Sequence, residues 1–168
     1  MKKRLKLVIT IVAAVLIICL LVWRFWPHPV SSVVAVGENT ITSLWAYGMF
    51  YSAEKGHCDL YTISGPNPKS SEPGEIMEIL AMSEYQQDFR NLLPWDVLPE
   101  AGNSYDGNAV GVDLFFQDKQ EYIRINFFSH NLIVVITSEQ PNMRIYHPTN
   151  SETFYKLVEY LRVHGVLQ

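Results

Sequence analysis

An uncharged apolar run, Leu7–Trp23, lies close to the N-terminus of this 168-residue chain. Its many β-branched residues disfavour a helix slightly in water, but a bilayer forces one because each unpaired backbone group there costs several kcal/mol. Extended to residues 5–26, the helix is about 30 Å long, which matches the hydrocarbon core of a membrane. Lys6 and Arg24 then reach the two interfaces. The sequence therefore predicts a transmembrane helix that contacts the lipid bilayer through residues 5–26.

The flanking residues give this predicted helix an orientation. "KKRLK", residues 2–6, precedes the run, and the positive-inside rule places such a segment in the cytoplasm. "WRFW", residues 23–26, supplies aromatic rings of the kind found at a membrane interface. We therefore expect residues 1–26 to form a cytoplasmic tip and a membrane anchor, and residues 27–168 to form one extracytoplasmic domain of a single-pass membrane protein.

Two other interpretations of the apolar run stay open. As a cleaved signal peptide it is longer than usual, and "RFWPHP" is bulky where small residues are expected, although "VSS" and "AVG" further on are weak sites. As a lipid attachment point, Cys19 lacks a small residue before it, because Ile18 precedes it and apolar sequence continues beyond it. The uncleaved anchor fits best, with Cys19 as a passive residue in the bilayer.

The charge of the chain is divided between its two parts. Five of the 13 basic residues lie in the N-terminal segment, whereas all 17 acidic residues follow Pro27. Residues 27–168 thus carry 8 basic and 17 acidic side chains, a formal charge of −9. Such a domain repels phosphate backbones and gains no counterion release, which excludes nucleic acid as a partner. The two cysteines, Cys19 and Cys58, provide no disulfide framework.

The first part of the domain carries strand patterns. "PHPVSS" marks a short linker, and the β-rich segments "VSSVVAV" (30–36) and "TITSLWAY" (40–47) are separated by "GEN". Two β-rich runs joined by turn residues predict a hairpin. Residues 58–63, "CDLYTI", predict a further short strand.

Helical spacing follows in two stretches. The first is a one-faced stripe of Ile76, Ile79 and Leu80. The second has Tyr85, Phe89, Leu92 and Leu93 at i, i+4, i+7 and i+8, after a capping-box pattern that begins at Ser83. The sequence thus predicts two helices with a break near Met82. Residues 94–108 then form a long loop rich in turn residues, a candidate surface for function.

The C-terminal third predicts an antiparallel sheet. Val112, Leu114 and Phe116 alternate with polar residues, and Ile123, Ile125 and Phe127 do the same after a short turn. "LIVVIT" (132–137) is apolar on both faces, as in a strand covered on both sides, and "MRIYH" (143–147) is a further strand. The turns are too short for crossovers, so these strands predict a meander.

A second capping box, Thr149–Glu152, opens a final helical pattern. Phe154, Leu157, Val158 and Leu161 share one face, and Gly165 occupies the C-cap position. This helix must bury that face against the sheet. The predicted fold class is α+β: a transmembrane helix followed by an antiparallel meander with helices packed on one face.

The chain resembles the small uncharacterised single-pass membrane-anchored α+β domains of Gram-positive bacteria. The resemblance rests on the charged N-terminus, the single span, the helical section and the meander that ends in "IYHPTNSETFYKLVEYL". It implies mainly the topology. It implies no catalytic residues.

Few residues carry recognisable chemistry. His57 and Cys58 in "GHCDLY" would point to opposite faces of a strand, so they cannot form a nucleophile–base pair, and Cys58 is expected to be a small buried residue. The five histidines lack metal-binding spacing, and the acidic residues of 94–108 do not match a calcium loop. We therefore expect no cofactor, no metal and no enzymatic activity, with an envelope enzyme that uses Cys58 as the less favoured alternative.

Aromatic residues are the remaining feature. Strand alternation places Trp45 and Tyr47 on one face, with Tyr51 close by and Trp95 in the long loop. Such residues are ordinarily core; alternatively, they form a patch that binds a protein or a glycan of the cell envelope. Our main hypothesis is a non-enzymatic binding or sensing domain with these four aromatics as candidate partner-binding residues. An envelope inhibitor or immunity-type protein is the alternative.

Overall fold

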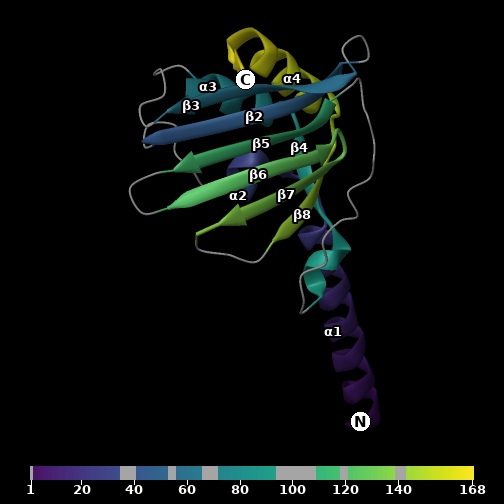
Figure 1. Ribbon diagram of the computed structural model, residues 1–168. Coiled ribbons are helices and arrows are strands. Elements are labelled where there is room, and N and C mark those ends of the chain that lie inside the picture. The colour runs from purple at the N-terminus through teal and green to yellow at the C-terminus, as the bar shows by residue number, and fades with distance from the viewer. Residues whose placement is uncertain are drawn as a thin grey trace.

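The computed structural model of the protein describes residues 2–34, 41–52, 56–65, 72–93, 109–117, 121–138 and 143–168. Helix α1 (Lys2–Arg24) extends away from the rest of the chain, as Figure 1 shows. By length and composition, residues 6–24 of this helix can cross a membrane. The expected apolar helix is therefore confirmed.

The remaining described residues build a nine-stranded antiparallel sheet, in the order β1-β4-β8-β7-β6-β5-β2-β3-β9. The long strands are β2 (Ser43–Ser52), β3 (His57–Gly65), β5 (Ala109–Gln117), β6 (Tyr122–Ser129), β7 (Leu132–Thr137) and β8 (Arg144–Pro148). The short ones are β1 (His28–Pro29), β4 (Glu84–Gln87) and β9 (Val166–Leu167). Strands β5 to β8 are neighbours in chain order, so the predicted meander is confirmed.

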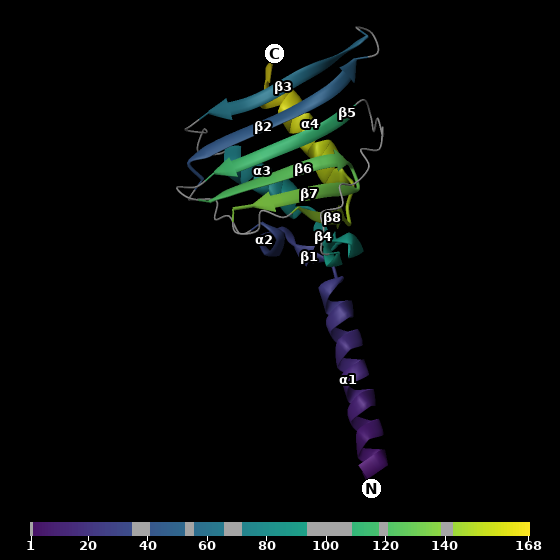
Figure 2. The same ribbon diagram turned by 60° about the horizontal axis from the view of Figure 1, so that its bottom comes forward.

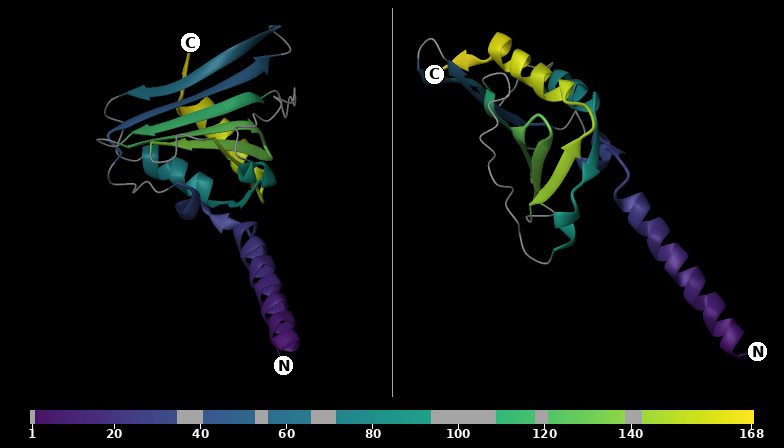
Figure 3. Two further views of the ribbon diagram at one scale, coloured as in Figure 1. Left: turned by 90° about the horizontal axis from the view of Figure 1, so that it is seen from below. Right: turned by 90° about the vertical axis from the view of Figure 1, so that its right-hand side faces the viewer.

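Helices cover one face of this sheet. Helix α3 (Glu72–Ala81) and helix α4 (Glu152–His164) pack on the same side; Figure 2 shows them behind the strands, and the right-hand view of Figure 3 shows both on one side of the sheet. The apolar stripes predicted for both helices are buried, including Ile76, Leu80, Leu157 and Leu161. The α+β architecture with helices on one face of an antiparallel sheet is thus as the sequence predicts.

The core lies between the sheet and these helices. The largest fully buried side chains among the described residues come from the strands and from the two helices: Leu44, Ile76, Leu80, Tyr85, Leu114, Phe116, Ile125, Phe127, Ile133, Phe154, Leu157 and Leu161. Gly48 lets α4 approach β2 closely, because a Cβ there would lie 2.5 Å from the Phe50 ring and 3.0 Å from Leu161. The other face of β2 is left to solvent.

The hairpin predicted over residues 30–47 is wrong. Val30–Val33 form a short helix, α2, and β2 pairs with β3 and β5 instead. The β-branched residues of 30–36 gave a strand pattern, but Val30 and Val34 bury their side chains in the core from this helical turn. The burial of these side chains in the core outweighs their local conformational preference, which is worth less than about 1 kcal/mol per residue.

The second predicted helix, at Tyr85–Leu93, is also wrong. Residues 84–87 form β4 between β1 and β8, and Phe89–Leu92 form a 3-10 helix, η2. Tyr85 is buried as a strand residue, and its hydroxyl donates a 2.8 Å hydrogen bond to the Leu80 carbonyl. Phe89 and Leu92 point into solvent instead of a core.

Two local expectations need correction near the helices. Thr149 does not cap α4; the Glu152 amide donates to the Asn150 side chain at 2.9 Å, whereas the C-cap at Gly165 is confirmed. The predicted linker "PHPVSS" is part of the fold, because His28 and Pro29 pair with Tyr85 and Glu84. The domain is therefore joined to α1 through a strand of its own sheet.

Candidate functional site

The face of the sheet opposite the helices carries aromatic side chains. On β2, Trp45, Tyr47, Met49 and Tyr51 alternate with the buried residues of the core. Tyr47, Met49 and Tyr51 are exposed, and Trp45 is half-buried, so the interpretation of these residues as core is wrong. The structure brings three of the four candidate residues together on one strand. Trp95 lies outside the described residues.

Rings from three strands meet beside Trp45. Trp45 is paired with Phe115 of β5, and their ring centroids are 5.4 Å apart in an edge-to-face arrangement. Phe115 stacks on Tyr122 of β6 at 5.8 Å. Aromatic pairs of this geometry stabilise a sheet by about 0.5–1.5 kcal/mol beyond their buried area. The three rings form a continuous row across β2, β5 and β6.

A buried carboxylate lies next to this aromatic row. Asp113 of β5 has a side chain that is only 4% exposed, and it pairs with Arg124 of β6, which is 46% exposed. Arg124 Nε donates to both carboxylate oxygens at 3.1 and 3.0 Å, and its Nη2 donates to Oδ2. Tyr47 donates its hydroxyl proton to Asp113 Oδ2, and Asn126 Nδ2 lies 3.3 Å from the same atom.

The network fixes the protonation of its members. Burial, and then the hydrogen bond to Asp113, raise the pKa of the Tyr47 hydroxyl above its ordinary value. The hydrogen bond to Asp113 raises the pKa of Arg124. Tyr47 is therefore a neutral donor and Arg124 a permanent cation. Such a network orients the side chains of Tyr47 and Arg124.

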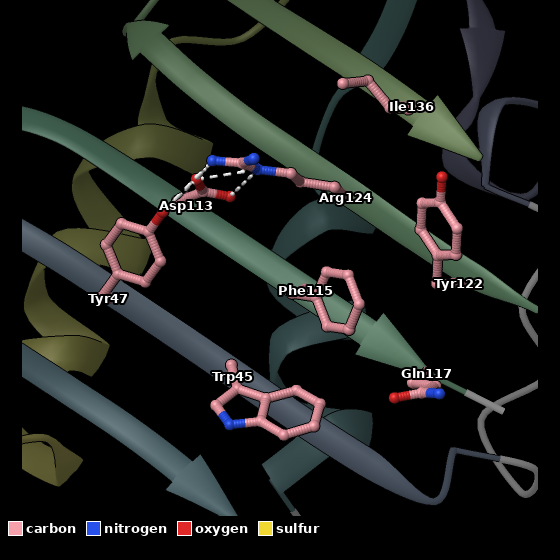
Figure 4. Close-up of a pocket in the computed structure, with 8 residues that line it drawn as sticks. All are labelled: Trp45, Tyr47, Asp113, Phe115, Gln117, Tyr122, Arg124 and Ile136. Atoms are coloured by element: carbon pink, nitrogen blue, oxygen red, sulfur yellow. Dashed lines mark hydrogen bonds and ion pairs between the residues drawn. The ribbon is translucent and has the colours of Figure 1, made fainter. Parts of the chain in front are cut away.

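These residues line an open depression of about 660 Å³, shown in Figure 4. Its walls are Trp45, Tyr47, Asp113, Phe115, Gln117, Tyr122, Arg124 and Ile136. The rings of Trp45 and Phe115 lie at one side and the Asp113–Arg124 pair at the other. We call these eight residues the outer-face site.

Sequence reasoning missed most of the outer-face site. In the sequence, Asp113 and Arg124 are two of the polar residues that alternate with the apolar positions of the predicted strands. A charged residue at the centre of an apolar strand is a usable signal, because it must find a partner if it is buried. The partner is evident only from the register, which places Arg124 opposite Phe115 and diagonal to Asp113.

The structure places His57 and Cys58 at the start of β3. Cys58 is exposed, so its expected burial is wrong. The two side chains lie on opposite faces of the strand, as predicted, and His57 Nε2 is 3.3 Å from Asp59 Oδ1. Within the described ranges, no group of three His, Cys, Asp or Glu side chains is arranged to hold a metal ion. The acidic residues of 94–108 lie outside those ranges.

A second polar cluster surrounds Asp88, between β4 and η2. Arg90 Nη2 and His147 Nε2 each lie 2.7 Å from Asp88 Oδ2, and His147 Nδ1 is 2.9 Å from the Asn131 carbonyl. Burial alone would raise the pKa of Asp88, but the hydrogen bonds from Arg90 and His147 outweigh it and hold the pKa well below its usual range. The cluster ties β4, β8 and the β6–β7 turn together.

Comparisons with known proteins add nothing to this geometry: no protein-family model, curated protein or solved structure matches the chain. The resemblance to Gram-positive membrane-anchored domains therefore stays a prediction. Function has to be argued from the residues themselves.

Proposed function

We propose that this protein is a membrane-anchored domain of the cell envelope, with α1 across the bilayer, its N-terminus in the cytoplasm and the sheet outside. The support is the uncharged apolar length of α1 and the separation of charge along the chain. Basic residues 2–6 precede the span, and a domain of formal charge −9 follows it.

The two cysteines provide a test of this orientation. Cys58 is exposed on the domain, and Cys19 lies within α1. In intact cells treated briefly with a reductant, a membrane-impermeant maleimide should label the protein, and Cys58→Ser should abolish the labelling. Labelling that appears only after the membrane is permeabilised would place the domain in the cytoplasm and contradict the proposal.

The activity that the geometry supports best is binding of a partner, without catalysis, at the outer-face site. The observation that carries this proposal is the row Trp45–Phe115–Tyr122 beside Arg124, left on the open face of the sheet. Aromatic residues and arginine dominate the binding energy of protein interfaces, and exposed apolar patches mark such surfaces. The buried Asp113 holds Arg124 and Tyr47 in fixed positions, which lowers the entropy lost on binding.

The shape of the site favours a macromolecular partner. Small-molecule pockets bury most of their ligand, whereas this depression is open, and the same face of β2 carries two further exposed side chains, Met49 and Tyr51. The acidic domain favours a basic partner, since complementary charge accelerates encounter. We therefore assign a protein of the cell envelope as the partner, and a glycan that stacks on the rings is the other outcome that the experiment can detect.

Site-directed photo-crosslinking tests the assignment. A photoreactive phenylalanine analogue replaces Tyr122 at the outer-face site or, as a matched control, the exposed Tyr155 of α4 on the helical side. We expect one discrete protein adduct from position 122, none from position 155, and loss of the adduct when Trp45→Ala and Phe115→Ala are added. A ladder sensitive to glycan hydrolases would indicate a saccharide partner. Equal adducts from both positions, or none, would contradict the proposal.

A further inference from the structure

The 3-10 helix η2 (Phe89–Leu92) exposes apolar side chains, which a surface turn normally buries. Phe89 is 68% exposed, Leu92 is 51% exposed, and Leu93 directly after the helix is 38% exposed. Residues three apart are superposed on a 3-10 helix, so Phe89 and Leu92 share one side. We call Phe89, Leu92 and Leu93 the η2 apolar surface.

The polar residues of η2 are turned inward and fasten it to the sheet. Asn91 Nδ2 donates to the Ile145 carbonyl at 2.8 Å, and its Oδ1 accepts from the Ile145 amide at 2.8 Å. Asp88 caps the helix by accepting from the Arg90 amide at 2.7 Å and pairs with the Arg90 guanidinium. Specific hydrogen bonds therefore hold η2 in the orientation that directs its apolar side chains outward.

The register of the sheet places this surface beside the end of α1. Strand β1 leads away from α1, and β4 runs antiparallel to it, with His28 opposite Tyr85 and Pro29 opposite Glu84. Residues after Tyr85 therefore run back towards α1. Figures 2 and 3 agree, because η2 lies next to the point where α1 enters the domain. Trp23 and Trp26, both strongly exposed, lie at this same end.

We infer that the η2 apolar surface inserts into the interface of the bilayer that α1 spans, at the boundary between headgroups and acyl chains. The inference rests on the membrane anchoring proposed above. The bilayer is the occupant that continuity favours, because the surface adjoins the end of the span and only three residues, Phe25, Trp26 and Pro27, separate α1 from β1. Short apolar elements with aromatic residues bind at this depth.

This second contact fixes the orientation of the domain relative to the membrane. A single helix followed by a free linker would let the domain rotate about its tether. Here β1 is paired into the sheet and η2 adds a contact on the same plane, so two points hold the domain. The outer-face site is then presented at a constant angle and height above the bilayer.

Fluorescence quenching in vesicles tests the inference with the full chain. In a Cys19→Ser, Cys58→Ser background, an environment-sensitive fluorophore is attached at Phe89→Cys, at Leu92→Cys or, as a control, at Val163→Cys. Val163 is an exposed residue in the last turn of α4, a helix that Figure 1 shows at the side of the domain away from α1. The vesicles are of phosphatidylcholine and phosphatidylglycerol, with or without nitroxide-labelled lipids, and each variant is first shown to retain the circular dichroism of the unlabelled protein.

The expected result is a blue-shifted emission and loss of most intensity to nitroxide lipids at positions 89 and 92, with neither effect at position 163. Equal, water-like emission at all three positions in protein that floats with the vesicles would overturn the docking of η2 while the anchor stands. Quenching at all three positions would show non-specific adsorption and would also overturn it. Failure of the protein to float with the vesicles would contradict the anchor itself.

Discussion

The asymmetry of the Asp113–Arg124 pair leads to a quantitative prediction about stability. The Asp113 side chain is 4% exposed and that of Arg124 is 46% exposed. Arg124→Met leaves a buried carboxylate that keeps, among the described residues, Tyr47 and Asn126 as its side-chain donors. Asp113→Leu instead leaves a guanidinium that can turn towards water. Breaking a buried pair costs about 3–5 kcal/mol, and because Arg124 is half-exposed we expect roughly 3 kcal/mol for Arg124→Met.

The single and double variants together form a cycle. Asp113→Leu should cost about 1 kcal/mol, the value of the hydrogen bond lost by Tyr47. The double variant should be more stable than Arg124→Met alone, because apolar replacement of a buried pair is often neutral. For a chain of this length, roughly 3 kcal/mol lowers the melting temperature by about 6–12 °C. Urea and thermal unfolding in detergent micelles, followed by tryptophan fluorescence, measure the differences.

The cycle can refute the reasoning in two ways. A larger loss for Asp113→Leu than for Arg124→Met would show that the buried charge is not the dominant cost. A double variant that loses the sum of the two single losses would show that the side chains act independently.

Two further predictions concern the packing and the pH dependence of the fold. Gly48→Ala should destabilise the domain by about 1–3 kcal/mol, because the new Cβ would lie 2.5 Å from the Phe50 ring. Gly74→Ala in α3 is the control: its Cβ would meet nothing within 4 Å, so this variant should be neutral or slightly stabilised. Chemical unfolding measures the free energy of unfolding of both variants. The pKa of Asp88 is lower in the folded protein than in the unfolded chain, so the unfolded state binds more protons in acid. The stability that Asp88 contributes is therefore fully present above about pH 4 and is lost as the pH falls below that value. Unfolding midpoints of the wild type and Asp88→Asn should therefore differ more at neutral pH than in strong acid; a difference that does not change with pH would contradict this assignment.

The sequence predicts well the elements whose pattern is unambiguous over many residues. The alternation at Val112–Phe116 and Ile123–Phe127 specifies two strands and their inward faces, because a slip of one residue would expose every apolar side chain. The stripe of α4 is equally clear. The long apolar helix α1 is likewise predicted from length and composition alone.

The failures have one physical cause: segments too short to choose a structure by themselves. Tyr85–Leu93 has helical spacing, but β4 exists because β1 and β8 supply its hydrogen-bond partners, and η2 exists because Asn91 bonds to the backbone of Ile145. The residue pattern of a short segment gives no information about hydrogen-bond partners that lie elsewhere in the chain. The outer-face site could not be predicted for the same reason, since Trp45, Phe115 and Arg124 meet only through the register of three strands.

Oxidative footprinting of intact cells tests the central claim, that the outer face of the sheet is a binding surface. Solvent-exposed aromatic residues are modified by hydroxyl radicals and quantified by mass spectrometry, in cells and in the purified full-length protein. The account predicts that Tyr47 and Tyr122 are modified readily in the purified protein and much less in cells, whereas Tyr155 on α4 is modified equally in both. Equal modification of Tyr47 and Tyr122 in cells and in the purified protein would show that nothing covers this face, and would contradict the account.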